Sequence, residues 1–387
     1  MTLKDKAAIV GLGATEFSKN SGRSELQLAV EAVSAALKDS GIDAKEVDGI
    51  CTYTMDNSTE IEVFRSIGAR ELKFFSRVNY GGGGAVAPLL HAAMAVATGV
   101  ASVVVCYRSM NERSGDRFGQ PQVRVLPETE MALSGYHIFH GLQTASSRLG
   151  LVMRRYMHET GATSDDFANI SIAARRHAAN NPNAFFFGKP ITRNDYMASR
   201  MIADPFRLLD CCQESDGAVA VVVTSTERAR SLRQKPVLIR AAAQAAPRGT
   251  MITLNLYRND ITPRDECRSA GNQLYKMAKL EPKDIQVGII YDHFGPTVLP
   301  ALEGYGFCKP GEAKDFIKNG NIEIGGDFPI NTNGGQLGEA YIHGMNGVAE
   351  AVRQVRGTSC NQVSNVQNVL VTAGNGLPTS AAILAAS

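Results

Sequence analysis

Two distant stretches of this chain follow the same pattern. Each begins with an acidic residue, continues through a lysine and a second acidic residue, and then enters an apolar run that ends in tyrosine. The two copies are residues 43–53 and 281–291, and the tyrosine falls at the same offset in both. A long helical pattern precedes each copy. A repeated unit of this kind predicts two similar halves, which we place at residues 1–235 and 236–387.

Apolar runs that can form buried strands recur along both halves, at Ala7–Gly11, Gly49–Tyr53, Ala218–Thr224 and Ala381–Ala385. Amphipathic helical patterns lie between them. Ser24 and Gly41 fit the caps of the first helix, and Thr262 is expected to cap the helix that precedes the second repeat. Strands that are apolar on both faces and alternate with helices are typical of a layered α/β fold.

The first half is longer because of an insertion over about residues 109–205. This segment is rich in arginine, methionine and aromatic residues. We expect a loop excursion that covers a site and does not form a separate domain.

One segment, Ala85–Tyr107, is long and apolar enough to suggest a membrane span. Pro88 and Gly99 interrupt it, so we interpret it as a buried helix over about residues 85–97 and a buried strand at Val103–Tyr107. No membrane span is expected.

The charge balance and the cysteines narrow the class of protein. The 40 basic residues nearly match the 38 acidic ones, which argues against nucleic-acid binding. The seven cysteines form no C-x-x-C pair, and the N-terminus does not resemble an export signal. These features indicate reduced thiols and a cytoplasmic location. Cys211 and Cys212 are adjacent but lack spaced partners, so no metal site is expected.

Two glycine-rich motifs could suggest nucleotide binding. Gly11 and Gly13 follow a strand, but Glu16 stands where the dinucleotide fingerprint needs a third glycine. The run Gly81–Gly84 precedes a helix, but no Lys-Ser/Thr follows it, which excludes a phosphate-binding P-loop. Backbone N–H groups in such a turn could instead hold an oxyanion.

Two further segments carry candidate functional side chains. Tyr291, Asp292 and His293 end a predicted strand, where active sites of α/β proteins lie. Tyr341 and His343 lie in the glycine- and asparagine-rich stretch 331–347. Such a stretch suggests close approach of the backbone to a ligand or to another chain. A buried tyrosine with a satisfied hydroxyl is the alternative for Tyr291.

The order of these motifs resembles the thiolase superfamily, in its sterol-carrier-protein-x branch. The resemblance rests on Asp210–Ala218, Asn331–Gly335 and Tyr291–Phe294. It implies a thiolase fold, with two duplicated βαβαβ halves in an α-β-α-β-α core and an inserted loop domain. The catalytic residues differ from that pattern: Gly82 falls at the nucleophilic cysteine, and Thr372 falls near the second cysteine. Tyr291 and Tyr341 replace the catalytic histidines.

These replacements resemble the thiolase-like steroid side-chain aldolases, as do Asn20–Leu26, Asn111–Gly119 and Glu339–Gly347. The resemblance implies retro-aldol cleavage of a 17-hydroxy steroid CoA thioester with a three-carbon side chain. The products would be a 17-ketosteroid and propionyl-CoA. No cofactor is implied, since CoA is part of the substrate. The implied partners are a second copy of the chain and an OB-fold DUF35 protein, possibly joined to an enoyl-CoA hydratase.

Retro-aldol cleavage requires a base for the tertiary hydroxyl and groups that stabilise the departing enolate. We expect Tyr291 and Tyr341 to share the acid and base roles, and which one is the base stays open. The pKa of free tyrosine is about 10, so a neighbour must lower it, and His293 and His343 are the expected helpers. Asp292 is placed as a supporting residue.

The backbone N–H groups of Gly81, Gly82 and Gly83 are expected to bind the enolate. A glycine at position 82 is also expected to leave room for the steroid.

Two alternatives remain at this point. One is another acyl-CoA-processing enzyme that uses a relocated cysteine, such as Cys106 or Cys211. The other is a catalytically inactive thiolase-like scaffold or lipid-binding protein, which the loss of the nucleophile would explain.

Overall fold

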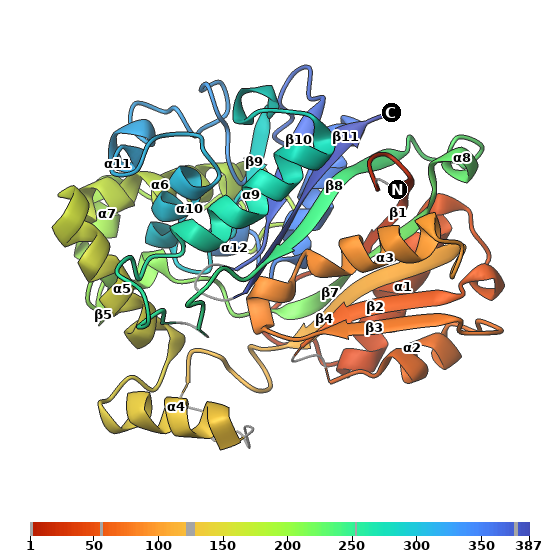
Figure 1. Ribbon diagram of the computed structural model, residues 1–387, viewed down its shortest axis with the longest axis horizontal. Coiled ribbons are helices and arrows are strands. Elements are labelled where there is room, and N and C mark those ends of the chain that lie inside the picture. The colour runs from red at the N-terminus through yellow and green to blue at the C-terminus, as the bar shows by residue number, and fades with distance from the viewer. Residues whose placement is uncertain (1–2, 55–56, 121–127, 252–253, 375–377) are drawn as a thin grey trace.

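The computed structural model describes residues 3–54, 57–120, 128–251, 254–374 and 378–387. Its centre is a mixed sheet with the strand order β3-β2-β4-β7-β1-β8-β11-β10-β9 (Figure 1). The first half contributes β1 (Ala7–Ala14), β2 (Gly49–Tyr53), β3 (Phe74–Val78), β4 (Val103–Asn111) and β7 (Asp216–Ser225). The second half contributes β8 (Val237–Ala245), β9 (Val287–Ile289), β10 (Asn368–Thr372) and β11 (Thr379–Ala386). The halves meet where β1 pairs with β8.

The two halves have the same strand order. We number the strands of each half in chain order. From the outer edge of the sheet to its middle, the first half then has the order third, second, fourth, fifth and first strand. The second half has the same order, except that a single bridge from Ile330 to Gly288 takes the place of the third strand. The duplication predicted from the repeat is therefore confirmed in the topology. The acidic–lysine motifs form matching 3-10 turns, η1 (Ala44–Glu46) and η4 (Pro282–Asp284), each closed by a capping box.

The two repeat tyrosines differ in one respect. Tyr53 ends β2, but β9 stops at Ile289, two residues before Tyr291. The side chain of Asn331 accepts a hydrogen bond from the Ile290 N–H and donates one to its carbonyl, each at 2.8 Å. The Asn331 side chain thus takes the place of a neighbouring strand beside Ile290, and Tyr291 lies beyond the end of β9.

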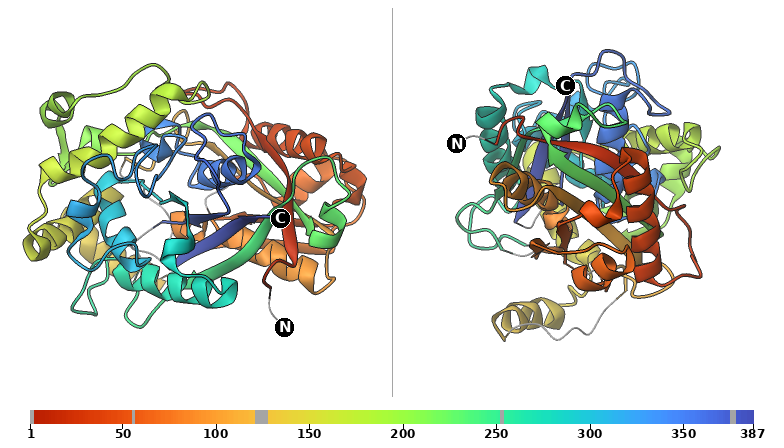
Figure 2. Two further views of the ribbon diagram at one scale, coloured as in Figure 1. Left: turned by 90° about the horizontal axis from the view of Figure 1, so that it is seen from above. Right: turned by 90° about the vertical axis from the view of Figure 1, so that its right-hand side faces the viewer.

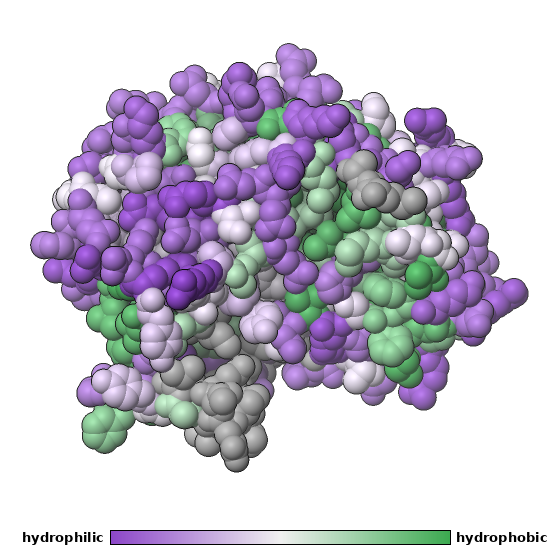
Figure 3. Space-filling model, in the orientation of Figure 1, coloured by the Kyte–Doolittle hydropathy of each residue, from purple (hydrophilic) through white to green (hydrophobic). Residues whose placement is uncertain are grey.

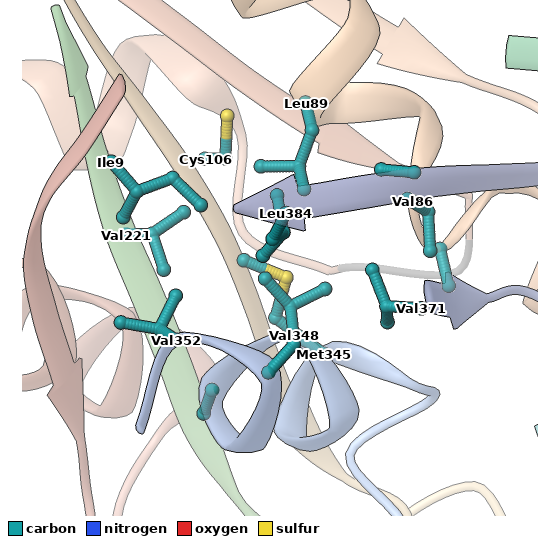
Figure 4. Packing of buried hydrophobic residues seen from close by; sticks show 14 of the residues in the cluster. Ile9, Val86, Leu89, Cys106, Val221, Met345, Val348, Val352, Val371 and Leu384 are labelled. Carbon is teal, nitrogen blue, oxygen red and sulfur yellow. The ribbon is translucent and has the colours of Figure 1, made fainter. Parts of the chain in front are cut away.

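The helices arrange the sheet into five layers. α1 (Glu25–Ser40) covers the outer face of the first-half strands, and α9 (Arg264–Ala278), backed by α10 (Val298–Gly304), covers that of the second half. α3 (Ala87–Ala97) and α13 (Met345–Arg356) lie between the strands of the two halves. Leu89, Val348, Ile9 and Leu384 pack together there (Figure 4). This is the expected α-β-α-β-α arrangement.

The insertion is more helical than the sequence suggested. It carries α4 (Glu128–Phe139), α5 (Ala145–Thr160), α6 (Ser164–Asn180), α7 (Arg193–Ala198) and the short strand β5 (Met201–Ala203). Capping boxes at Thr144, Thr163 and Thr192 begin α5, α6 and α7, which explains why this polar segment forms helices. α4 stands away from the body (Figures 1 and 2) and exposes Phe139.

The remaining short elements are α2 (Glu60–Ser66), η2 (Gly81–Gly84), β6 (Phe206–Arg207), η3 (Leu208–Asp210), α8 (Thr226–Ala229), η5 (Gly295–Thr297), α11 (Ala313–Phe316) and α12 (Gly335–Gly338). The connection between the halves falls between α8 and β8.

Most local predictions agree with the structure, with one correction. Ser24 and Gly41 cap α1 as expected. Pro263, not Thr262, is the N-cap residue of α9, because the Thr262 hydroxyl accepts a hydrogen bond from the Arg264 side chain instead. The long apolar segment Ala85–Tyr107 is divided between α3 and β4. Within the described residues, no helix has both the length and the apolar character that a membrane crossing requires.

The surface in the view of Figure 3 is largely hydrophilic. Apolar side chains gather over α3 and the open edge of the sheet at β3, where Met94 and Phe75 are exposed.

Candidate active site

Two buried segments that are far apart in sequence meet beside the C-terminal end of β9. One carries Tyr291 and the other carries Tyr341. A third segment runs between them: the Cys212 N–H donates to the His293 carbonyl, and the Tyr341 N–H donates to the Gln213 carbonyl, each at 3.0 Å. Backbone hydrogen bonds therefore fix both tyrosine segments to one common strip of chain.

The hydroxyl groups of Tyr291 and Tyr341 form a hydrogen bond of 3.1 Å. Their rings are 6.5 Å apart and nearly perpendicular, and the residues are only 3% and 6% exposed. Burial raises the pKa of both tyrosines well above the ordinary value. Either hydroxyl can donate this hydrogen bond, so the pair can pass a proton in either direction.

Gly82 forms the wall against which Tyr291 packs. A Cβ atom at position 82 would lie 2.2 Å from the Tyr291 hydroxyl oxygen. Gly344 also packs against the ring, since a Cβ there would lie 2.7 Å from Cε2 of Tyr291. The expectation that glycine at 82 leaves room for a steroid is therefore wrong, because the phenol of Tyr291 fills that space. Glycine at position 82 and tyrosine at position 291 therefore require each other, because a side chain at 82 would collide with the phenol.

Each tyrosine lies beside the histidine two residues after it. The Tyr291–His293 ring centroids are 5.0 Å apart, and the Tyr341–His343 centroids are 5.6 Å apart. Burial lowers the pKa of His293 to about 3, so this ring is neutral at pH 7. His293 therefore cannot lower the pKa of Tyr291 through a positive charge at pH 7, because burial penalises the charged form of its ring.

His343 adopts a positive φ of 53°, which is uncommon for a residue with a side chain. The Tyr53 hydroxyl donates to its carbonyl at 2.9 Å, and the Phe118 ring lies against its imidazole at 5.4 Å. Tyr53 is the counterpart of Tyr291 in the first repeat. Its hydrogen bond therefore helps to hold the segment that carries Tyr341.

Asp292 contacts the glycine-rich stretch 331–347. Its Oδ1 accepts a hydrogen bond of 2.8 Å from the Gln336 N–H, and burial raises its pKa to about 6. A Cβ at Gly335 would lie 2.0 Å from Oδ2. Asp292 thus anchors the glycine-rich stretch and supports the site indirectly.

The whole stretch 331–347 is buried. Gly334 and Gly338 pack against Ala178 of α6, where a Cβ would lie 2.6 Å from the alanine methyl group. The Glu339 carboxylate accepts hydrogen bonds from the side chains of Asn346 and Asn181 at 3.0 and 3.2 Å. The close backbone approach inferred from the glycines is therefore to other parts of this chain.

The glycine turn η2 faces the tyrosines but offers fewer free N–H groups than expected. The Gly83 N–H donates to the Tyr80 carbonyl at 3.1 Å. The N–H groups of Gly81 and Gly82 make no hydrogen bond with any residue that the structure describes. Tyr80, with a φ of 82°, sets the turn. Gly81 and Gly82 are the donors left for an oxyanion.

Two neighbours of the site, the partly buried Phe118 and the buried Glu112, were not singled out from the sequence. Phe118 contacts the Tyr341 ring at 6.3 Å, edge to face, and Glu112 lies buried nearby. Both belong to the stretch Asn111–Gly119, and its resemblance to the aldolase motifs was the only available signal. Among the described residues, no cluster of three or more histidine, cysteine or acidic side chains could hold a metal ion.

Comparison with known proteins places this site in a family. The 17-hydroxy-3-oxo-4-pregnene-20-carboxyl-CoA lyase of Mycobacterium tuberculosis is 57% identical over 384 residues, which cover 99% of this chain and 100% of that protein. The steroid side-chain-cleaving aldolase of Thermomonospora curvata is 57% identical over 386 residues, or 99% of each chain. The chain belongs to the steroid side-chain-cleaving aldolase family.

Structural comparison gives the same assignment for this aldolase. The solved structure "Ltp2-ChsH2(DUF35) aldolase" matches with a TM-score of 0.95 and 56% identity, covering 100% of this chain and 99% of that chain. Human mitochondrial 3-ketoacyl-CoA thiolase, 14% identical, matches with a TM-score of 0.71 over 100% of this chain and 99% of that chain, which shows the shared fold. The family model "Thiolase C-terminal domain-like" matches residues 253–386.

Proposed function

We propose that this aldolase cleaves the CoA thioester of a 17-hydroxy steroid with a three-carbon side chain, yielding a 17-ketosteroid and propionyl-CoA. The observation that carries the proposal is the hydrogen-bonded pair Tyr291–Tyr341, set against a glycine at position 82. Two hydroxyl groups can move protons but cannot form an acyl-enzyme as a cysteine does. The site therefore supports proton-assisted carbon–carbon cleavage.

The tyrosine pair can serve as a proton relay without a stable phenolate. The substrate's tertiary hydroxyl gives its proton to Tyr291 while Tyr291 passes its own proton to Tyr341, and Tyr341 releases its own proton to the enolate carbon. The carbon–carbon bond breaks, its electron pair moves onto the thioester as an enolate, and the ketone forms. The enolate carbon then takes up one proton, so no proton is gained or lost overall.

Two features of the site favour this relay over a preformed base. The high pKa values of both tyrosines keep them protonated at pH 7. The 3.1 Å hydrogen bond supplies the path between them. The backbone N–H groups of Gly81 and Gly82 would donate to the enolate oxygen. The reaction is redox-neutral and the thioester holds the electron pair, so the proposal includes no cofactor.

The cysteine alternative has weaker support. Cys106 is fully buried in β4, and burial raises its pKa well above the ordinary value, as it does for Cys211 to about 12. A protonated, buried thiol is a poor nucleophile. The scaffold alternative explains the missing nucleophile but gives no reason for two hydroxyl groups in hydrogen-bond contact.

The proposal includes two protein partners. The open edge of the sheet at β3, with Phe75 exposed, suits pairing with a second copy of the chain. The similar solved structure carries DUF35 in its name, which supports an OB-fold DUF35 partner. A hydratase joined to that partner and a cytoplasmic location stay predictions.

The test is product analysis with a 17-hydroxy-steroid CoA ester bearing the three-carbon side chain. The protein would be co-purified with its OB-fold partner and assayed without free CoA. We expect equal amounts of 17-ketosteroid and propionyl-CoA. Tyr291→Phe and Tyr341→Phe should each lower turnover by about 10²-fold or more, in the range of a lost proton-transfer group.

The matched control is Tyr275→Phe on α9, whose hydroxyl donates to the Tyr305 carbonyl away from the site. This variant should keep its activity. Near-normal turnover in both site variants would refute the tyrosine assignment. Absence of product from the folded complex would favour the scaffold alternative.

A further inference from the structure

Glu112 is a buried carboxyl group that the tyrosine relay does not use. It directly follows β4 and is only 2% exposed, and both of its carboxyl oxygens are buried. No side chain in the described part of the chain forms an ion pair with it within 4 Å, although Glu214 nearby pairs with Arg117. A carboxyl group is rarely buried in this way without a specific reason.

One stretch of chain connects Glu112 to the tyrosines. Glu112 and Phe118 both belong to the stretch Asn111–Gly119. The ring of Phe118 contacts Tyr341 and His343 edge to face. Neither carboxyl oxygen of Glu112 has a hydrogen-bond partner among the described residues. Glu112 is thus an unpartnered carboxyl group in the same stretch as a residue that contacts the tyrosine pair.

The charged groups around Glu112 come from several elements. Arg108 on β4 and Lys19 after β1 favour its carboxylate form, and Glu214 opposes it. Lys19 is already held by the Glu214 carbonyl at 2.6 Å and the Gln213 amide oxygen at 3.1 Å. Burial outweighs these neighbours and raises the pKa of Glu112 well above its ordinary value.

The charge on Glu112 acts directly on the reacting groups. A Glu112 carboxylate raises the pKa of Tyr291, Tyr341 and Cys212 alike. A negative charge on Glu112 therefore disfavours a second negative charge at the site, whether the second charge develops on a tyrosine or on the enolate. Like charges repel most strongly where the surroundings are apolar.

We propose that Glu112 is a positioning residue of the aldolase site that must stay a neutral carboxylic acid for the tyrosine pair to transfer protons and for the enolate to form beside it. In this state it places no charge beside the Asn111–Gly119 stretch, whose Phe118 ring contacts Tyr341. When it loses its proton, it blocks the reaction by charge repulsion. This inference rests on the proposed retro-aldol function.

The test compares the wild-type complex with Glu112→Gln and Glu112→Asp complexes across pH. Glutamine keeps the shape of the neutral acid but cannot ionise, whereas aspartate keeps an ionisable group. Both tyrosines ionise far above the neutral range, so Glu112 should set the alkaline fall in kcat/KM. One pH unit above that midpoint, wild-type kcat/KM should have fallen about tenfold. The ratio of Glu112→Gln to wild type should therefore rise about tenfold over its value at pH 7. Glu112→Asp should still show an alkaline fall.

Infrared difference spectroscopy reads the protonation state without relying on activity. We expect the carbonyl stretch of a buried protonated carboxylic acid at pH 7 in the wild type, absent in Glu112→Gln. Raising the pH until this band is lost should remove activity over the same range. A missing band at pH 7, or an alkaline fall that Glu112→Gln retains unchanged, would overturn the inference. Failure of the proposed function is distinguishable, because the wild-type complex would then give no product while the band would still report on Glu112.

Discussion

Replacing Gly82 by alanine tests the central packing relationship of the site. The new Cβ would lie 2.2 Å from the Tyr291 hydroxyl oxygen, whereas ordinary contact begins at 3.4 Å. The hydroxyl must therefore move by about 1 Å. Tyr291 has little room to shift, because Gly344 also lies close against its ring. The displacement breaks the 3.1 Å hydrogen bond to Tyr341, which is the path of the proposed relay.

Two magnitudes follow for Gly82→Ala. A misplacement of about 1 Å in a catalytic group can lower turnover by about 10²-fold. Overpacking of one methyl group in a tight core typically destabilises a protein by about 1–3 kcal/mol. We therefore expect kcat in the product assay to fall about 10²-fold while the complex remains folded, with a lowered Tm.

The matched control is Gly135→Ala on α4, where an added Cβ meets no atom within 4 Å. This variant should keep both activity and Tm. If Gly82→Ala kept kcat within about threefold of the wild type, the tyrosine geometry would not limit the reaction and the reasoning would be refuted.

Two further predictions concern stability and thiol chemistry. The pKa of Asp292 is about 6 in the folded protein against an ordinary 3.8, so its ionisation opposes folding as the pH rises from about 4 to 6. Asp292→Asn should raise the free energy of unfolding at pH 8 by on the order of 2 kcal/mol and leave it nearly unchanged at pH 4, as measured by urea denaturation; equal effects at both pH values would contradict this. Iodoacetamide at pH 7.5 should label the exposed Cys360 first, located by mass spectrometry, without loss of turnover. Inactivation that persists in Cys360→Ser and follows labelling of Cys212 would point instead to a functional thiol.

The large-scale architecture was predictable because it depends on patterns within short stretches of chain. The repeated acidic–lysine motifs predicted the duplication, and they became matching capped turns. Apolar runs predicted the buried strands, since strands covered on both faces need apolar residues throughout. Helix starts were less certain: Thr262 looks like a cap, but its hydroxyl is used by Arg264, a contact that local patterns do not reveal.

The candidate site was only partly predictable. Residue pattern alone predicted two α/β halves, a glycine where related enzymes carry a nucleophile, and tyrosines at the end of a strand and within the glycine-rich stretch. Only the tertiary structure showed that the Tyr291 phenol fills the space above Gly82, that His293 is neutral, and that Glu112 lies buried beside the pair. The physical reason is that residue type and spacing are local properties. Burial and the distances between side chains, which determine pKa values and steric fit, exist only once segments hundreds of residues apart have packed together.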